Sequence, residues 1–313
     1  MKVKIDIFSG FLGAGKTLLI KKLISTGAYK ENIAIIENEF GEVSIDSLIL
    51  RDTNIKIREI NSGCICCEVT GDFKEACIEV IDKYKPDRII IEPSGVAKLT
   101  DIIKVFKEAD LRDKVVIENL ITVINPEKYD SYITNFKEFY IDQIKNAKKI
   151  VISRVEKVDN LKLAKIEKSI RSINTKSEII RKPYNELNSN EILNESLNSE
   201  KLRIENSHFK ASLKGIVKEK SKAKDVFESY AIYPKNIFSK AELNAKFKFI
   251  ASSKAYGDII RAKGVINLRE GNYGQFDYAG EEFELREMKK KIDSVISFIG
   301  VNLNKEELKK FFS

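Results

Sequence analysis

The feature that most constrains the fold of this chain is a glycine-rich segment near its start. It matches the pattern G-x-x-x-x-G-K-[ST] in full and reads Gly10-Phe11-Leu12-Gly13-Ala14-Gly15-Lys16-Thr17. An apolar β-type run at residues 3–8 precedes it, and a helical pattern at residues 16–25 follows it. A strand, a glycine-rich turn and a helix in this order predict a phosphate-binding loop, because backbone N–H groups and the positive helix end then face the phosphates.

The residue types within this loop have distinct expected roles. Lys16 is expected to reach the β- and γ-phosphate oxygens and to act in catalysis, and the Thr17 hydroxyl is expected to hold Mg²⁺. The other contacts to the nucleotide are expected from Gly10, Gly13, Ala14, Gly15 and Leu18. The alternative is a strand–helix turn that binds nothing, and the matching flanks argue against it.

Alternating elements fill the first half of the chain. Further β-type runs at 33–37, 55–60, 88–92, 115–124 and 149–153 alternate with helical patterns at 72–83, 99–109, 131–146 and 161–173. Several runs are continuously apolar, which is typical of parallel strands covered on both faces. The pattern predicts an α/β fold, a P-loop NTPase domain with a mostly parallel, doubly wound sheet.

The composition changes near residue 185. Residues 185–206 are rich in Asn, Ser and Glu and predict a short helix and a linker. Strands are then expected at 209–217, 258–268, 274–278, 283–287 and 294–299, with helices at 239–249 and 304–312 capped by Ser239 and Asn304. Because 313 residues suit two domains, we expect a P-loop domain at 1–184, a linker at 185–206 and a smaller α+β domain at 207–313.

Composition excludes several classes of protein. The 55 Lys and Arg residues exceed the 47 Asp and Glu residues, but they are interspersed and form no basic stripe, so no nucleic-acid partner is expected. No apolar run approaches the ~20 residues that span a bilayer, and no leader pattern stands at the start, so a cytoplasmic chain without a membrane partner is expected. The single histidine, His208, excludes a multi-histidine metal cage.

A second nucleotide-site motif ends an apolar strand and reads Ile89-Ile90-Ile91-Glu92-Pro93-Ser94-Gly95. Glu92 is expected near Mg²⁺ through water, with a role in positioning the attacking water. The N–H group of Gly95 is expected to face the γ-phosphate. Taken alone, the segment would favour a strand that simply ends in a solvated glutamate, and its pairing with the glycine-rich loop argues against that alternative.

Three cysteines, Cys64, Cys66 and Cys67, form a C-x-C-C cluster. In a reducing compartment this spacing suits a thiophilic ion such as Zn²⁺, and three sulfur ligands leave a fourth position open for metal transfer. A redox-active vicinal pair and inert buried thiols are the alternatives. Cys77, on the next helical pattern, is expected in the core.

Acidic residues follow the second strand. Glu39 is expected to meet Mg²⁺ or the attacking water, and Glu37 or Glu42 to complete the metal site of the cysteines. The alternative is a solvated acidic turn.

These motifs, in this order, resemble the CobW-type family of P-loop GTPases, the relatives of the HypB and UreG metallochaperones. The matching segments are residues 10–17, Asn38-Glu39-Phe40-Gly41-Glu42, Cys64-Ile65-Cys66-Cys67 and Glu92-Pro93-Ser94-Gly95. Ile260-Arg261-Ala262-Lys263-Gly264 resembles the R-x-K-G motif of the CobW C-terminal domain, and Phe298-Ile299-Gly300 resembles its final strand. The resemblance implies Mg²⁺-dependent GTP hydrolysis coupled to delivery of Zn²⁺ or Co²⁺ to a client metalloprotein, with a homodimer as one candidate assembly.

Two departures from the family pattern are visible. The guanine-reading N-K-x-D is replaced by Ser153-Arg154-Val155-Glu156. Glu156 is expected to accept from guanine, Arg154 to stack on the base and Ser153 to lie at the base edge, so GTP and ATP both remain candidates. The histidine-rich tract of many members is absent from the sequence. An activator of a corrinoid or other cofactor-dependent enzyme, and a metal-responsive nucleotide-binding regulatory module without turnover, are the alternative functions.

Overall fold

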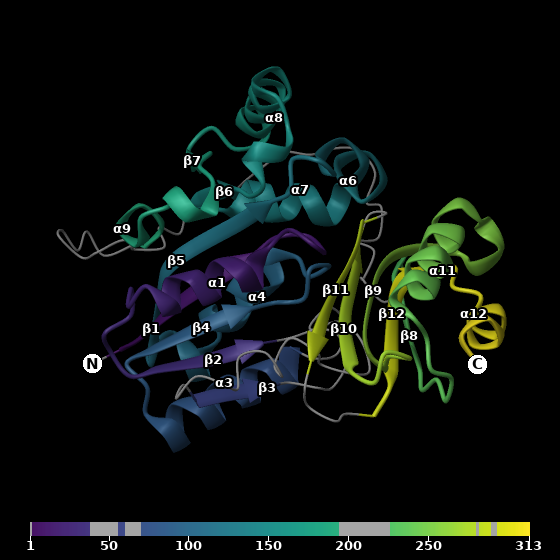
Figure 1. Ribbon diagram of the computed structural model, residues 1–313. Helices are drawn as coiled ribbons and strands as arrows, with labels where there is room; N and C mark the ends of the chain where they lie inside the picture. The colour runs from purple at the N-terminus through teal and green to yellow at the C-terminus, as the bar shows by residue number, and fades with distance from the viewer. Residues whose placement is uncertain (1, 38–55, 60–69, 194–225, 280–281, 289–292) are drawn as a thin grey trace, which may run out of the picture.

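Two β-sheets organise the chain (Figure 1). A computed structural model describes residues 2–37, 56–59, 70–193, 226–279, 282–288 and 293–313. The first sheet has the strand order β3-β2-β4-β1-β5-β6-β7, and the second has the order β11-β10-β9-β12-β8. The proposed linker at 185–206 lies in part, and the expected strand at 209–217 lies wholly, outside the described residues.

The first sheet is parallel throughout. Its strands are β1 (Val3–Ser9), β2 (Ile33–Glu37), β3 (Lys56–Glu59), β4 (Arg88–Glu92), β5 (Val115–Ile124), β6 (Lys149–Ile152) and β7 (Glu178–Ile180). The side chains of β4, and those of β1 from Ile5 onwards, are buried on both faces of the sheet, as a doubly wound sheet requires. This confirms the α/β fold with a parallel sheet. The three-residue β7 was not predicted, because so short a run has no readable period.

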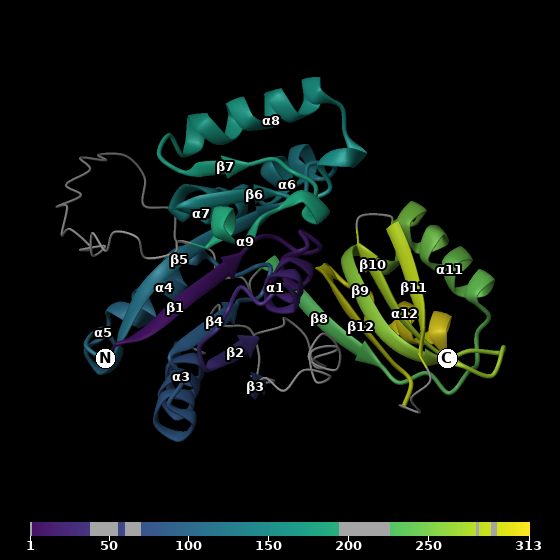
Figure 2. The same cartoon turned by 60° about the vertical axis from the view of Figure 1, so that its left-hand side comes forward.

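Helices cover both faces of this sheet (Figure 2). They are α1 (Lys16–Ser25), α3 (Thr70–Tyr84), α4 (Leu99–Lys107), α5 (Ala109–Arg112), α6 (Tyr129–Asn135), α7 (Lys137–Asn146), α8 (Asn160–Ile173) and α9 (Ser189–Ile192), with 3₁₀ turns η1 (Val155–Lys157) and η2 (Tyr184–Glu186). Ile89 and Ile91 pack with α3 and α4, whereas Ile90 packs with α1 on the opposite face. Alternate residues of β4 therefore pack against helices on opposite faces of the sheet.

The single helix expected at 131–146 is wrong. The chain forms α6 and α7 instead, and Phe136 between them leaves the helical backbone at φ −123°. Its ring stacks on Phe11 of the glycine-rich loop, with the ring centres 5.1 Å apart. The break thus brings an aromatic side chain to the loop, which sequence periodicity alone does not reveal.

The second sheet is antiparallel. It comprises β8 (Glu228–Ile232), β9 (Asp258–Asn267), β10 (Tyr273–Ala279), β11 (Glu282–Met288) and β12 (Val295–Val301), with helices α11 (Lys240–Ser252) and α12 (Lys305–Phe312) and the turn η3 (Lys254–Tyr256). Ser239 caps α11 in a capping box and Asn304 caps α12, which confirms both expected helix starts. β8 was not predicted, because its pattern is only weakly alternating.

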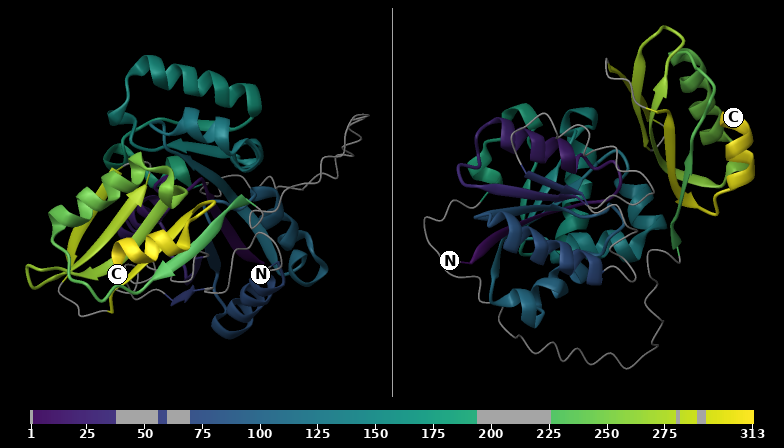
Figure 3. Two further views of the ribbon diagram at one scale, coloured as in Figure 1. Left: turned by 90° about the vertical axis from the view of Figure 1, so that its right-hand side faces the viewer. Right: turned by 90° about the horizontal axis from the view of Figure 1, so that it is seen from below.

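The faces of the second sheet differ in polarity. One face carries Phe276 and Phe298, which pack with Phe247 of α11 and Phe312 of α12. Figure 3 shows these two helices on the side of the sheet that faces away from the first sheet. The other face turns towards the glycine-rich loop and α1. Within the described ranges, every helix is too short or too polar to cross a bilayer.

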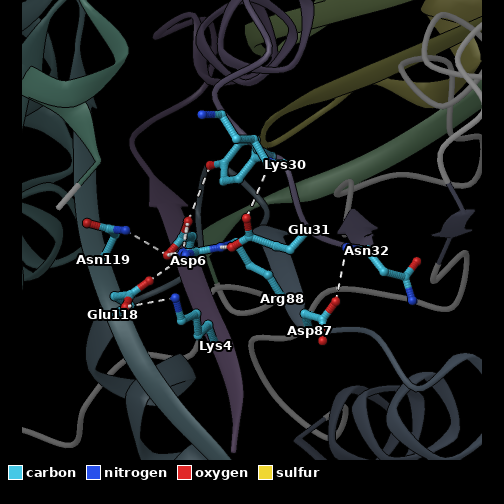
Figure 4. A network of polar contacts seen from close by, with 10 residues as sticks. Lys4, Asp6, Lys30, Glu31, Asn32, Asp87, Arg88, Glu118 and Asn119 are labelled. Carbon is cyan, nitrogen blue, oxygen red and sulfur yellow. Dashed lines mark hydrogen bonds and ion pairs between the residues drawn. The ribbon is translucent and has the colours of Figure 1, made fainter. Parts of the chain in front are cut away.

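A buried ion-pair network ties β1, β4 and β5 together (Figure 4). Arg88 donates from Nη1 to both Asp6 carboxylate oxygens at 2.8 Å and from Nε to Glu31 at 2.7 Å. Its Nη2 also pairs with Glu118 at 2.5 Å, and Asn119 donates to Asp6 at 2.7 Å. Because Arg88 begins β4 and Glu92 ends it, the network lies towards the sheet edge opposite the loop. Its role is to hold the central strands together.

Candidate nucleotide site

The glycine-rich loop follows β1 and leads directly into α1. Gly10, Gly13 and Gly15 all have positive φ angles, of 140°, 69° and 98°. A Cβ on Gly10 would lie 2.3 Å from the carbonyl oxygen of Val123, so only glycine fits there. Gly15 forms the N-cap of α1 without a side chain, which leaves the first helical N–H groups available to an anion.

Two side chains of α1 point into the loop region. Lys16 is buried, and its Nζ donates to the carbonyl oxygen of Gly10 at 2.9 Å. The Thr17 hydroxyl donates to Oε1 of Glu92 at 2.8 Å. The structure therefore brings together the three side chains that the sequence assigns to phosphate, Mg²⁺ and water. A hydroxyl and a carboxylate are hard oxygen ligands, and this donor set fits Mg²⁺.

Glutamates end three neighbouring strands at the carboxyl edge of the sheet. Glu37 ends β2 and lies beside Glu92 of β4 on one side and Glu59 of β3 on the other. Glu37 is buried. Gly95 comes so close to the loop that a Cβ there would lie 2.7 Å from the Leu12 nitrogen. The acidic edge and the loop thus form one continuous region.

The Ser153–Glu156 segment contacts the loop from the other side. The Ser153 hydroxyl donates to the carbonyl oxygen of Ala14 at 2.8 Å, and Arg154 Nη1 donates to that of Gly13 at 3.3 Å. Arg154 adopts a left-handed backbone, with φ 48°, which directs its side chain to the loop. Glu156 is exposed on η1. Ser153 and Arg154 therefore hold the loop, a role that was not assigned to them from the sequence.

Two tyrosines also bind the loop and were missed by the sequence analysis. The Tyr184 hydroxyl donates to the carbonyl oxygen of Gly15 at 3.2 Å, and the Tyr132 hydroxyl to that of Leu12 at 3.2 Å. Burial raises the pKa of both phenols, that of Tyr132 to about 12, so both stay protonated donors. No motif signals these contacts, because both tyrosines lie more than a hundred residues from the loop.

A pocket opens over the loop and is closed on its far side by the second sheet. Its cavity volume is about 110 Å³. The pocket is lined by residues 13–18 of the loop and the start of α1, together with Lys21 and Glu92. The second sheet contributes Arg261, Lys263, Gln275, Phe276, Asp277, Glu284 and Arg286. The R-x-K-G motif was the signal that could have brought Arg261 and Lys263 into the predicted site.

Several expected site residues lie outside the described residues, namely Glu39, Glu42, Cys64, Cys66 and Cys67. Within the described part of the chain, no group of three or more His, Cys, Asp or Glu side chains could hold a metal ion. Cys77 of α3 is fully buried, as expected, and burial raises the pKa of its thiol far above the usual range. Cys77 is therefore a core residue and not a metal ligand.

Comparison with known families agrees with this geometry. Residues 4–181 match the CobW/HypB/UreG nucleotide-binding domain, and residues 227–313 match the cobalamin synthesis protein cobW C-terminal domain. The chain belongs to the CobW/HypB/UreG family. The resemblance inferred from the motifs is confirmed for both parts of this CobW-family chain.

Curated relatives match part of the first domain. The zinc chaperone CobW of Sinorhizobium sp is 36% identical over 131 residues, 40% of this chain and 37% of that protein. The zinc chaperone YjiA of Escherichia coli K12 is 32% identical over 141 residues, 43% of this chain and 44% of that protein. The chain thus spans less than half the length of these relatives. A crystal structure of Zn(II)-bound YjiA GTPase from E. coli aligns with a TM-score of 0.48 at 20% identity, covering 100% of this chain and 98% of that one.

Proposed function

We propose that this CobW-family protein is a cytoplasmic, Mg²⁺-dependent GTP hydrolase that binds a thiophilic metal, Zn²⁺ or Co²⁺, and delivers it to a client metalloprotein. The observation that carries the proposal is the 2.8 Å pair of Thr17 and Glu92 beside the buried Lys16, within a loop that only glycines can form. We further propose the domain division at residues 1–184, 185–206 and 207–313.

In the proposed reaction the loop binds the phosphates through its backbone N–H groups. Lys16 exchanges the carbonyl oxygen of Gly10 for the β- and γ-phosphate oxygens. Thr17 would hold Mg²⁺ and Glu92 its coordinated water, and the ion would neutralise charge on the transferred phosphoryl group. Glu39 or Glu92 orients the attacking water, and Gly95 offers its N–H group to the γ-phosphate.

Guanine selection is assigned to Glu156. Its carboxylate is exposed on η1, two residues beyond Arg154 and three beyond Ser153, which hold the loop. A carboxylate accepts two hydrogen bonds from the N1–H and N2–H₂ groups of guanine. Adenine offers no such pair of donors on that edge, so we propose GTP over ATP.

The metal cargo is assigned to Cys64, Cys66 and Cys67 with Glu37 or Glu42. Support comes from the thiolate chemistry of C-x-C-C and from relatives named as zinc chaperones. Glu37 ends β2 in register with Glu92, and the cysteines follow β3 in the sequence. We therefore propose that the nucleotide state sets metal affinity and that the metal reciprocally sets nucleotide affinity.

The test is a Zn²⁺ titration of the full chain, purified under reducing conditions, with and without a non-hydrolysable GTP analogue. Different Zn²⁺ affinities in the two states are expected, and equal affinities would remove the coupling. Cys66→Ala is expected to abolish stoichiometric binding. Cys77→Ala is the matched control, because that thiol is buried in the core and should leave Zn²⁺ binding unchanged. Unchanged binding in Cys66→Ala would show that the metal site is misassigned.

A further inference from the structure

We propose that Arg261 and Lys263, on the C-terminal sheet, contact the terminal phosphate of a nucleoside triphosphate bound on the glycine-rich loop. The C-terminal domain then completes the anion site and distinguishes a triphosphate from a diphosphate. This inference rests on the proposed nucleotide site and assigns to the second domain a role in it.

The strand pattern directs these two cations to the loop. Ala262 of β9 is buried among the aromatic side chains that pack on α11 and α12. Arg261 and Lys263, its neighbours in a strand of period two, lie on the opposite face and line the pocket with the loop. Their side chains are largely buried there, since Arg261 is 13% exposed and Lys263 is 5% exposed. They are therefore part of a built site and not a solvated charged surface.

Apolar packing fixes the sheet against the loop itself. Phe227, Ile260 and Ile299 of the second domain belong to one buried cluster with Phe11 and Leu12 of the loop. A register shift in the β9–β12 pairing leaves Ile260 as an extra residue, so that Ile299 lies opposite Arg261. Such a bulge re-aims side chains. The side chains that anchor the sheet to the loop thus stand next to Arg261.

Phe11 and Leu12, the loop residues that pack against the second domain, lie at the end of the loop that receives the γ-phosphate. Lys16, the ligand of the β- and γ-phosphates, points to the carbonyl oxygens of Gly10 and Phe11, at 2.9 and 3.5 Å. The Tyr132 hydroxyl bonds the next residue, Leu12, at 3.2 Å. Burial raises the pKa of Tyr132, and the nearby positive charge of Arg261 counters this rise. Arg261 therefore stands within electrostatic reach of the Leu12 end of the loop.

Charge in the pocket favours a polyanion. Six basic side chains line it against three acidic ones, Glu92, Asp277 and Glu284. Arg261 is held by Asp277 in a two-point pair, with Nη2–Oδ2 at 2.8 Å and Nε–Oδ1 at 3.2 Å. This pair orients the guanidinium group before a ligand arrives. Cations that neutralise the γ-phosphate are a general requirement of phosphoryl-transfer sites, and an arginine supplied by the same chain is one known solution.

The test compares the full wild-type chain with the single variants Arg261→Gln and Lys263→Gln. Competition against a fluorescent nucleotide measures the affinity of each protein for a non-hydrolysable GTP analogue and for GDP. Each variant is expected to lose about tenfold in affinity for the triphosphate analogue, the size of one charge-assisted contact, while GDP affinity stays within about twofold. Arg269→Gln is the matched control. Arg269 lies in the same domain, is 63% exposed, pairs with Glu242 and does not line the pocket.

The outcomes separate this inference from the proposed function. If the wild-type chain binds neither nucleotide, the proposed nucleotide site itself fails. If the wild type binds both and the variants match it, or lose both nucleotides equally, Arg261 and Lys263 do not sense the γ-phosphate and the inference is wrong. Should Arg261→Gln unfold the domain, Arg261→Lys keeps the charge, and it must retain triphosphate affinity above that of Lys263→Gln for the inference to stand.

Discussion

The hydroxyl of Ser153 donates a 2.8 Å hydrogen bond to the carbonyl oxygen of Ala14 in the glycine-rich loop. This bond joins the segment assigned to base recognition to the loop assigned to phosphates. Because the hydroxyl is buried and used in this way, Ser153 stabilises the loop, and we propose that base selection falls to Glu156.

Ser153→Ala is expected to weaken GTP and ATP binding alike. A buried neutral hydrogen bond contributes about 1 kcal/mol net, which corresponds to about fivefold in affinity. Competition titrations with both nucleotides measure the ratio of the two affinities. A change in that ratio, rather than an equal loss, would mean that Ser153 reads the base.

Glu156→Gln is expected to remove the preference for GTP over ATP. The glutamine amide replaces one of two acceptor oxygens by a donor, so one guanine contact becomes repulsive, and GTP affinity should fall about tenfold while ATP affinity changes little. Glu186→Gln, an exposed glutamate of η2, is the control. An unchanged GTP/ATP ratio in Glu156→Gln would assign guanine recognition elsewhere.

Thr17→Val is expected to raise the Mg²⁺ concentration needed for half-maximal GTP hydrolysis by about tenfold or more, because it removes the hydroxyl that faces Glu92. The matched control is Thr26→Val, which removes a hydroxyl that bonds only carbonyl oxygens at the far end of α1. If both variants show the wild-type Mg²⁺ dependence, the Thr17–Glu92 pair is not the ion site.

Arg88→Gln is expected to lower the free energy of unfolding by about 3–5 kcal/mol, because it leaves buried Asp6 and its neighbours without their cation. Arg112→Gln, whose partner Asp113 is largely exposed, should change it by less than about 1 kcal/mol. Urea unfolding of the full chain gives both values. Equal values for the two variants would show that the network of Figure 4 does not hold the strands.

The loss of unfolding free energy in Arg88→Gln is expected to depend on pH, in a direction set by Asp6. Burial raises the pKa of Asp6 above its usual value, and Arg88 partly opposes that rise. Without Arg88 the folded state binds the Asp6 proton more tightly than the unfolded state does. The loss of unfolding free energy in the variant should therefore become smaller as the pH falls towards that raised pKa, and larger as the pH rises. Unfolding curves near pH 5 and pH 8 measure this difference, and a deficit larger at pH 5 would contradict it.

Local patterns made much of the fold and the loop predictable. The segment from β1 through Gly10 to α1 is predictable because its glycines and the flanking strand and helix patterns lie in consecutive residues. Capping by Ser239 and Asn304 is equally local. The contacts of Tyr132, Tyr184 and Arg261 join segments that lie far apart in the sequence, and no periodic sequence pattern indicates them. The break at Phe136 is set by packing on Phe11, and periodicity cannot report it.

The most direct test of the proposed function is phosphate release from GTP by the full chain, with Mg²⁺ and Zn²⁺ present, compared with Lys16→Ala. Mg²⁺-dependent turnover that prefers GTP to ATP, and a loss of about a hundredfold or more in Lys16→Ala, are expected. Turnover equal to that of Lys16→Ala, or unaffected by removal of Mg²⁺, would contradict it.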